Sequence, residues 1–530
     1  ENGFYGFRLG RPLLPGDSAE LRFDVAQETH GFTNDVVNGP VVGNGTFFNN
    51  QEMPRIGYNA DGELQDDDTR KWHDLPPRAR IPRLDDPAGR MRNDISADAD
   101  WIAFETTVST SADQTAVAPG YLQRTWTAGG RRYFRYRMDA PILDFYAYLS
   151  GRYAVRRDRW HDVAIEVYYD PGHEFNLDRM VRSVKRSLDY YTEHFGPYQN
   201  RQVRILEFPR YAAYAQSYAN TIPYSEAIGF IAHVKPGDVD YPFFVTAHEV
   251  AHQWWGHQLV GAHVQGSAML SETLAEYSAL MVMEKEYGRE KMEDFLRYEL
   301  DQYLRGRGSE TRAEQPLYRV EQQGYIHYNK GGMAMYALRD YIGEDRVNAA
   351  LAALLHEQRF RGPPYATSRD LLRHLRAVTP DSLRYVLTDL FETVTLYENR
   401  TRAATATPLG GGRWMVDMTV EAHKMRADSA GNETEVPMND LVDVSVVGSA
   451  AGMENFPLYF AKQRLRSGVQ HVRVTVDGVP ARAGVDPRHK LIARRTADNV
   501  VNVVRKKALA PPKAARPTPA KPARSSAPRS

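Results

Sequence analysis

The stretch from residue 243 to residue 258 constrains the fold of this 530-residue chain more than any other. It reads FFVTAHEVAHQWWGHQ, and a helix with this sequence is apolar on nearly every side. A helix of that kind is buried in the protein core. Two histidines and a glutamate inside a core need a partner, because burial removes their hydration. The chain is therefore expected to fold around this helix and to supply a partner for its polar groups.

The spacing His248-Glu249-x-x-His252 indicates that the partner is a metal ion. Residues four apart share one face of a helix, so His248 and His252 can direct two imidazoles at one point. Neutral imidazoles are typical ligands of zinc. Glu249 lies about 100° round the helix from His248, beside the ligands, where its carboxylate can accept a proton from an attacking water. The motif predicts zinc-dependent hydrolysis.

The third zinc ligand is predicted to be Glu272, because a catalytic zinc site uses three protein ligands and leaves one position open. Glu272 stands in the first turn of a second predicted apolar helix, 270–288, where a lone carboxylate is costly. Glu276 follows on the same face. It either accepts a ring N–H from a ligand histidine or is an ordinary, partly exposed helix residue. We expect one zinc ion per chain.

Composition excludes several other classes of function. The chain has 67 basic and 67 acidic residues, so no net charge attracts nucleic acid or an anionic membrane. It has no cysteine, which excludes disulfides, cysteine-ligated zinc and thiol nucleophiles. We find no apolar run close to the roughly 18 residues that a membrane-spanning helix needs.

The pattern of apolar residues predicts a multidomain α+β protein. Residues 1–170 alternate as in antiparallel β-strands, 171–402 follow a mostly helical period, and 403–504 return to strands as in a β-sandwich. Residues 505–530 are rich in proline, alanine and basic residues, which is typical of a disordered tail. Charged residues and prolines at 66–87 predict a long surface loop.

The sequence HEVAHQWWG, followed by SET, resembles the gluzincin aminopeptidases of peptidase family M1, which include aminopeptidase N and leukotriene hydrolase. The resemblance implies a saddle-like N-terminal β domain, a thermolysin-like catalytic domain, and zinc on His248, His252 and Glu272. The family places eighteen residues between the second histidine and the glutamate, whereas this chain has nineteen. We interpret the additional residue as an insertion after the helix, and we expect neither His257 nor His263 to be a ligand.

Two further motifs resemble elements of the same family. IHYNKGG, at 326–332, resembles its Tyr-x-Lys-Gly element, which implies that the Tyr328 hydroxyl stabilises the developing oxyanion. Tyr325 is a weaker candidate. PYSEAIGFI, within a predicted edge strand at 221–234, resembles the exopeptidase motif GAMEN. Glu226 would then pair with the substrate α-ammonium, the alternative being an unrelated strand carboxylate.

The expected function is that of a zinc metallo-aminopeptidase acting on peptides, with Glu249 and Tyr328 as catalytic residues and Glu226 in substrate binding. The alternatives are a zinc endopeptidase on the same scaffold and a non-catalytic, peptide-binding or structural ectodomain of a membrane transport protein. The SET motif resembles that of bacterial domains joined to permease-like membrane segments. This resemblance implies a membrane-spanning partner segment, in the same or a longer chain, and a membrane-attached or periplasmic location, with the cytoplasm as the alternative.

Overall fold

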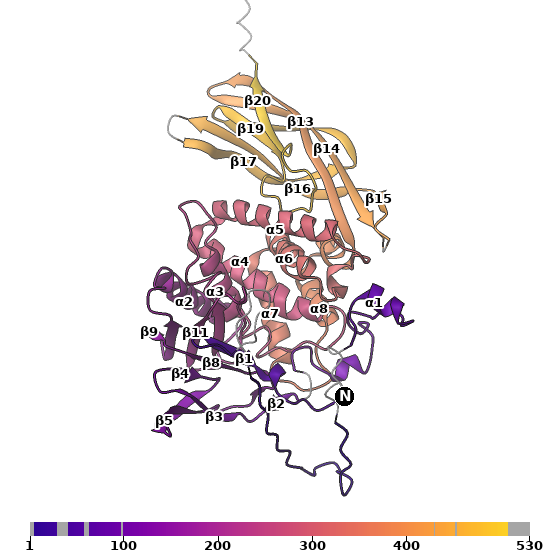
Figure 1. The fold of residues 1–530 in the computed structure, drawn as a ribbon. Helices are drawn as coiled ribbons and strands as arrows, with labels where there is room; N and C mark the ends of the chain where they lie inside the picture. Colours follow the sequence, from indigo (N-terminus) through magenta and orange to yellow (C-terminus); the bar gives the residue numbers. More distant parts are fainter. Residues whose placement is uncertain are drawn as a thin grey trace, which may run out of the picture. The chain divides into compact units, whose positions relative to one another are not determined.

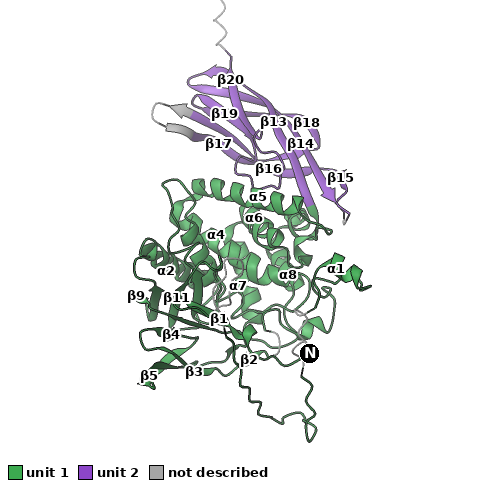
Figure 2. Ribbon diagram, in the orientation of Figure 1, with its two compact units in different colours: residues 1–394 green, residues 395–530 purple. Residues whose placement is uncertain are grey.

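The computed structural model describes residues 5–28, 41–57, 63–96, 99–428, 430–450 and 453–506. The chain divides into two compact units, residues 1–394 and 395–530 (Figures 1 and 2). Antiparallel sheets come first, helices follow, and a sheet domain ends the described chain, which confirms the predicted α+β class. The predicted division of the first unit near residue 170 stays a prediction. Residues 507–530, within the predicted tail, lie outside the described residues.

The N-terminal part of the first unit contains short antiparallel sheets. One has the order β1-β8-β4, a second has the order β3-β6-β5, and β2 pairs with β7. Buried Phe134 and Tyr136 alternate with exposed residues along β6, as the period of a half-buried strand requires. The strands are β1 (Thr46–Asn49), β2 (Trp101–Ile102), β3 (Glu105–Ser111), β4 (Thr115–Val117), β5 (Tyr121–Ala128), β6 (Arg131–Arg137), β7 (Ile142–Leu143) and β8 (Ala147–Gly151).

A short helix, α1 (Asp67–Trp72), lies where the sequence predicted only a surface loop. Asp66 is its N-cap, and its carboxylate accepts a hydrogen bond from the Thr69 N–H at 2.8 Å. A side-chain cap of this kind stabilises a helix end by about 1 kcal/mol. The prediction of an irregular segment was wrong here, because the local cap outweighs the absence of a long apolar pattern.

A four-stranded sheet of order β12-β11-β10-β9 lies beside the predicted metal helix. Its strands are β9 (Ala154–Trp160), β10 (Val163–Tyr169), β11 (Gln202–Phe208) and β12 (Thr221–Ser225). Strands β10, β11 and β12 are parallel, so their carboxyl ends meet at one edge. Strand β12 is shorter than the predicted stretch 221–234. The Asn176 amide donates instead to the following carbonyls of Gly229 at 2.7 Å and Ala232 at 2.8 Å.

Helices make up most of the rest of the first unit (Figure 1). Met180, Val184 and Leu188, spaced four apart, are buried on one face of α2, which packs on α3. Among the described residues, no helix combines the length and the apolar character needed to cross a bilayer. The helices are α2 (Leu177–His194), α3 (Tyr241–Ala251), α4 (Leu274–Tyr287), α5 (Met292–Gly308), α6 (Gly331–Ile342), α7 (Glu344–Gln358), α8 (Ser368–Val378) and α9 (Arg384–Leu387).

The second unit is a sheet domain, as predicted. Its strands form one hydrogen-bonded path, β15-β14-β13-β20-β19-β16-β17, and β18 pairs with β14. Every second residue of β14, β16 and β18 enters a shared core that includes Val420, Val444 and Val474. The strands are β13 (Val394–Gly410), β14 (Arg413–Ala427), β15 (Glu433–Val436), β16 (Asn439–Ala450), β17 (Met453–Arg466), β18 (Gly468–Asp477), β19 (Pro480–Val485) and β20 (Val500–Arg505).

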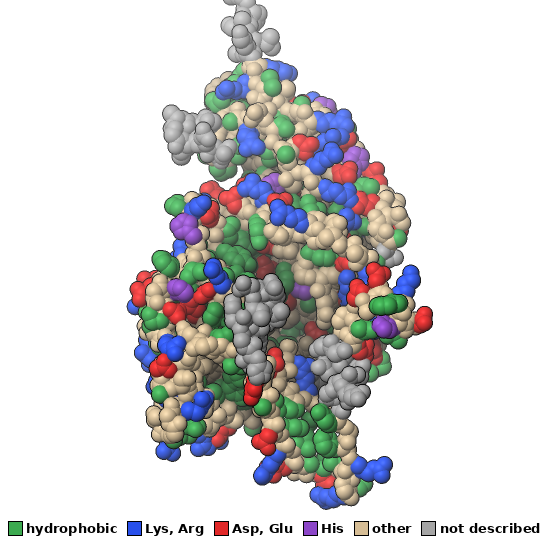
Figure 3. All heavy atoms as spheres, in the orientation of Figure 1, with side chains coloured by type: hydrophobic (Ala, Val, Ile, Leu, Met, Phe, Trp, Pro, Cys, Tyr) green, Lys and Arg blue, Asp and Glu red, His purple; other side chains and the backbone are tan. Residues whose placement is uncertain are grey.

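The surface carries charges of both signs. On the face drawn in Figure 3, basic and acidic side chains are interspersed and no large region of one sign appears. This distribution agrees with the equal numbers of basic and acidic residues in the chain. On this face the described residues form no broad basic region of the kind that binds nucleic acid.

Candidate metal centre

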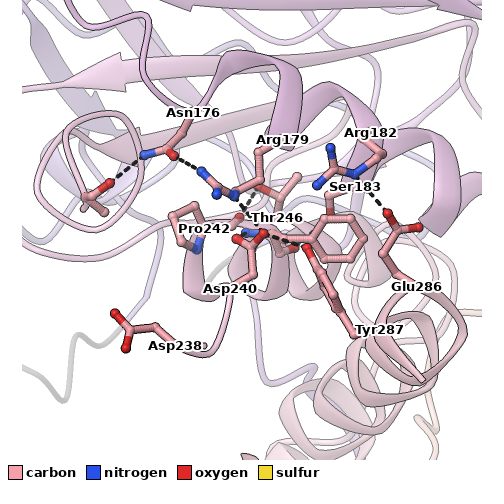
Figure 4. A network of polar contacts seen from close by, with 12 residues as sticks. Asn176, Arg179, Arg182, Ser183, Asp238, Asp240, Pro242, Thr246, Glu286 and Tyr287 are labelled. Carbon is pink, nitrogen blue, oxygen red and sulfur yellow. Dashed lines mark hydrogen bonds and ion pairs between the residues drawn. The ribbon is translucent and has the colours of Figure 1, made fainter. Parts of the chain in front are cut away.

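Helix α3, which carries the HExxH sequence, is fixed at its first turn by Asp240 (Figure 4). One carboxylate oxygen of Asp240 accepts a hydrogen bond from the Phe243 N–H at 3.2 Å. The other accepts from Arg179 Nε at 2.6 Å and from the Tyr287 hydroxyl at 2.5 Å. Because Arg179 lies on α2 and Tyr287 on α4, Asp240 ties the start of α3 to both neighbouring helices.

Two hydroxyls of α2 fix the rotation of α3 about its axis. The Ser183 hydroxyl donates to the Phe243 carbonyl at 2.7 Å, and the Tyr191 hydroxyl donates to the Ala247 carbonyl at 2.9 Å. Both hydroxyl-bearing residues are buried. The opposite face of α3, with His248, is therefore turned toward α4.

The three predicted ligands converge on one point. The Nε2 atoms of His248 and His252 lie 3.1 Å apart, and each lies 3.3 Å from Oε2 of Glu272. Tetrahedral zinc bonds of about 2.0–2.1 Å place ligand atoms about 3.3 Å from one another. Two imidazoles and one carboxylate are also a known donor set of catalytic zinc. The observed spacing and chemistry therefore fit a zinc ion.

Both imidazoles are oriented through their other ring nitrogen. His252 Nδ1 lies 3.0 Å from the Trp255 carbonyl oxygen, which can only accept a hydrogen bond. His248 Nδ1 lies 3.1 Å from Oε2 of Glu276. In each ring Nε2 is left free to bind a metal. Glu276 is only 3% exposed, so of the two interpretations of this residue the structure favours contact with a ligand histidine.

Replacing Glu276 by glutamine is expected to weaken zinc binding by about 10–100-fold, the usual effect of losing a carboxylate behind a ligand histidine. The amide keeps the volume of the side chain but removes the charge next to His248. Competition with a chromophoric chelator measures the affinity, and the exposed Glu290 gives a matched glutamine control. An affinity equal to that of the Glu290→Gln variant would show that Glu276 only fills space.

Glu272 and Tyr328 both lie on π-helical turns that come directly before helices α4 and α6. The turns are Met269–Thr273 and Tyr325–Lys330. A π-helical turn inserts one residue into a helical path, and such turns occur frequently at functional sites. The Thr273 hydroxyl donates to the His327 carbonyl at 2.6 Å and joins the two turns. Glu272 and Tyr328 thus lie on two turns that a hydrogen bond holds together.

The paired glycines after Lys330 let α6 approach α4 at this point. A Cβ atom on Gly332 would lie 2.7 Å from Cγ of Glu276, and one on Gly331 would lie 2.4 Å from the Thr273 hydroxyl. Neither contact leaves room for a side chain unless these residues move. The resemblance to a Lys-Gly element therefore has a steric basis in this fold.

Glu249 is buried beside the ligands and is 5% exposed. Among the described residues, no group donates a hydrogen bond to its Oε2 atom. Burial raises the pKa of this carboxyl, while the neighbouring His252 and His248 lower it. A buried oxygen without a partner costs free energy, and a water molecule between it and a metal would satisfy it. This geometry is the one a general base needs.

Tyr328 faces the same site. Its ring centroid lies 5.9 Å from that of His248. Tyr328 is 38% exposed as a whole residue, but desolvation of its hydroxyl raises the pKa well above the ordinary value, and the carboxylates of Glu272 and Glu249 raise it further. The phenol therefore stays protonated and can donate a hydrogen bond. Tyr325 donates its hydroxyl to Glu310 at 3.2 Å, away from the ligands, which favours Tyr328 of the two candidates.

The other two histidines near the motif, His257 and His263, contact other groups. His257 Nε2 donates to the Ser217 carbonyl at 2.9 Å, and burial lowers the pKa of this imidazole to about 4. His263 Nδ1 lies 2.9 Å from Oδ1 of Asp94. Neither belongs to the cluster formed by the three ligands.

Glu226 is not brought to the three ligands. The Asn220 N–H donates to Gln253, just past the end of α3, and the Tyr224 hydroxyl donates to the Pro242 carbonyl at its start. Strand β12 therefore runs antiparallel to α3, whose 11 residues span on the order of 16 Å. Glu226 follows the Tyr224 end, beyond the first turn of the helix. Its predicted role in amine binding stays a prediction.

Residues 214–218, which the sequence analysis did not single out, pair with β12 along the edge that faces away from β11. The bridges join Ala215 to Tyr224 and Tyr218 to Thr221. The Ser217 hydroxyl accepts a hydrogen bond from Gln253, the residue after the ligand His252, at 2.7 Å. This segment, rather than Glu226, therefore borders the metal helix. In the sequence, Asn220 was the residue that could have indicated a tight turn before β12, because asparagine tolerates a positive φ. Its φ in the structure is 49°.

Part of the chain is similar to known proteins. The family described as "Peptidase family M1 domain" matches residues 179–391. Human "Endoplasmic reticulum aminopeptidase 2" is 24% identical over 209 residues, 38% of this chain and 22% of that protein. "Aminopeptidase M1" of Arabidopsis thaliana is 22% identical over 335 residues, 61% of this chain and 36% of that protein. This chain thus matches only about a fifth to a third of the length of these relatives.

A solved structure also resembles the chain. It is the crystal structure of Legionella pneumophila aminopeptidase A in complex with aspartic acid, which is 15% identical with a TM-score of 0.49. The likeness covers 75% of this chain and 45% of that one.

Proposed function

Because residues 179–391 belong to peptidase family M1, we propose that this chain is a zinc-dependent aminopeptidase that removes residues from the N-termini of peptides. The relatives matched by the chain include proteins named as aminopeptidases in human and plant. The observation that carries the proposal is the convergence of two imidazole nitrogens and one carboxylate oxygen at 3.1–3.3 Å, with Glu249 and Tyr328 beside them.

His248, His252 and Glu272 would hold the zinc ion. Zinc in such a site polarises the scissile carbonyl and lowers the pKa of water, so that hydroxide attack is accessible near neutral pH. The two imidazoles are oriented before substrate arrives, because a carbonyl oxygen and a buried carboxylate already contact their other ring nitrogens. The site therefore needs little rearrangement to bind the metal.

Glu249 acts as the general base in this proposal. Its buried carboxylate removes a proton from the attacking water and then delivers it to the leaving amine. The raised pKa of this group, which follows from its burial, makes it a better base than an exposed glutamate. Tyr328 donates its phenolic hydrogen to the oxygen on which negative charge develops.

Replacing Tyr328 by phenylalanine is expected to lower kcat by about 10²–10³-fold with little change in KM, because the lost hydrogen bond forms only in the transition state. Steady-state kinetics on an aminoacyl fluorogenic substrate measure both constants. Tyr325→Phe is the matched control, since that hydroxyl contacts Glu310 instead. If the two variants lost activity equally, the assignment of Tyr328 would have no support.

An aminopeptidase is expected to cleave a peptide with a free N-terminus and to leave its N-acetylated counterpart intact. Acetylation removes the α-ammonium charge that an exopeptidase recognises through a charge-assisted contact. The measurement is liquid chromatography of the products from each peptide. Equal cleavage of both peptides would favour a zinc endopeptidase. That alternative is supported by the position of Glu226, which follows the end of β12 beside the start of α3 and not beside the three predicted ligands.

A further inference from the structure

A second group of potential metal ligands lies at the carboxyl edge of the parallel strands. His173 follows β10, Glu207 lies near the end of β11, and Glu226 follows β12. Because the three strands are parallel and adjacent, their carboxyl ends meet at one edge. Loops at such an edge commonly form ligand sites in sheets of this type. The topology therefore gathers one imidazole and two carboxylates from three separate segments.

The side chains meet in the way a metal site requires. Nδ1 of His173 and one oxygen each of Glu207 and Glu226 lie within 4.8 Å of one another. His173 Nδ1 contacts the Glu207 carboxylate directly and lies 4.0 Å from Oε2 of Glu226. The backbone N–H of Asp170 donates to the other oxygen of Glu207 at 2.6 Å and holds that carboxylate in place. One backbone contact and one side-chain contact therefore fix the Glu207 carboxylate at the centre of this cluster.

Charge at this edge favours a cation. The carboxylates of Glu207 and Glu226 lie close together, Glu207 is 3% exposed, and the nearby negative charge of Asp170 acts on Glu207. The nearest guanidinium among the described contacts is that of Arg210, whose Nε lies 3.8 Å from Glu226 and whose side chain is 74% exposed. An exposed cation at this distance contributes little. The other compensating group is the His173 imidazole in contact with Glu207, and a divalent ion bound by all three side chains would compensate the buried carboxylates more fully.

We propose that His173, Glu207 and Glu226 form a second divalent-cation site, separate from the HExxH centre and selective for a transition metal such as zinc. One imidazole nitrogen and two carboxylate oxygens suit Zn²⁺ or Mn²⁺, whereas Ca²⁺ takes oxygen ligands. The side chains of His173 and Glu226 are 30% and 17% exposed, so an ion can reach them from solvent.

The proposed ion would clamp the loop between β10 and α2 to the ends of β11 and β12. Asn176, in the same loop, donates to the carbonyls of Gly229 and Ala232. Arg179, on the first turn of α2, donates to the Asp240 carboxylate that caps α3 (Figure 4). The site therefore lies on the structure that supports the start of α3, and its role is structural.

The test counts zinc ions in full-length variants by mass spectrometry after equilibrium dialysis against buffered Zn²⁺. Wild type is expected to bind two ions per chain, and His248→Ala/His252→Ala is expected to bind one. Adding His173→Ala to that double variant is expected to remove the remaining ion. Glu174→Gln, at an exposed residue of the same loop outside the ligand set, is the matched control and should retain it.

Thermal unfolding keeps the test decisive where a variant folds poorly. Zn²⁺ is expected to raise the Tm of His248→Ala/His252→Ala, and this rise should disappear when the conservative Glu226→Gln change is added. One ion in wild type and none in His248→Ala/His252→Ala would overturn the proposal, as would an unchanged count after His173→Ala. These outcomes do not depend on activity, so failure of the proposed aminopeptidase function would be seen separately.

Kinetics of Glu226→Gln separate this site from the amine-binding role predicted for the same residue. If Glu226 binds a structural cation, Glu226→Gln and His173→Ala should change the KM for free-amine peptides to the same extent, because both remove a ligand of the same ion. A rise in KM confined to free-amine substrates, with both zinc ions still bound, would assign Glu226 to the substrate and overturn the cation site.

Discussion

Replacement of Glu249 by glutamine is expected to lower kcat by about 10²–10⁴-fold, the range that a positioned general base supplies. Glutamine has nearly the same shape, so it fills the buried position that Glu249 occupies at 5% exposure. It cannot accept a proton, however, and the attacking water then has no base. The measurement combines hydrolysis of an aminoacyl fluorogenic substrate with the zinc content of the same sample.

Three outcomes of this experiment carry different meanings. Loss of activity with unchanged zinc supports Glu249 as the base, because the carboxylate lies beside the ligands and is not one of them. Full activity in the variant would exclude that role. If zinc-loaded wild type were as inactive as Glu249→Gln, the chain would be a non-catalytic ectodomain that keeps the peptidase fold. Glu290→Gln, at an exposed glutamate, controls for the change of residue type.

The cluster of His248, His252 and Glu272 could be predicted from the sequence because its spacing rules are local. His248 and His252 are one helical turn apart, so any helix through them brings their rings together. Glu272 could be predicted because an apolar helix rarely carries an unpaired carboxylate. The sequence did not reveal the two π-helical turns that hold Glu272 and Tyr328, since one inserted residue leaves the apolar period of the flanking helices almost unchanged.

The surroundings of Glu226 depend on strand order, which a motif alone does not specify. The resemblance to GAMEN rested on one glutamate in a predicted edge strand, and β12 is indeed the last strand in its sheet. The direction of β12 relative to α3 decides which of its ends lies near His252, and only the contacts of Asn220 and Tyr224 reveal that direction. The same topology brings His173 and Glu207 to Glu226 from segments separated by more than 15 residues.

Replacement of His252 by alanine is expected to remove zinc from the HExxH centre and to abolish hydrolysis. The change leaves two ligands, whereas catalytic zinc sites use three protein ligands. Activity should stay absent after dialysis against excess Zn²⁺, while chelator-treated wild type should recover. His257→Ala is a close control, because His257 is a buried histidine five residues away whose imidazole contacts Ser217 and belongs to no ligand cluster.

The melting temperature provides a second way to measure the effect of His252→Ala on zinc binding. An ion that binds only the folded chain stabilises it by RT ln(1 + [L]/Kd), which is about 4 kcal/mol at a thousand times Kd. The HExxH ion should therefore raise the Tm of wild type, and His252→Ala should lose that share of the rise. Because the proposed site at His173 would add its own zinc-dependent stabilisation, the comparison is best made in a His173→Ala background. A full zinc-dependent rise in Tm for His252→Ala in that background would contradict the assignment of His252 as a ligand, since no other described ligand cluster would remain to bind the ion.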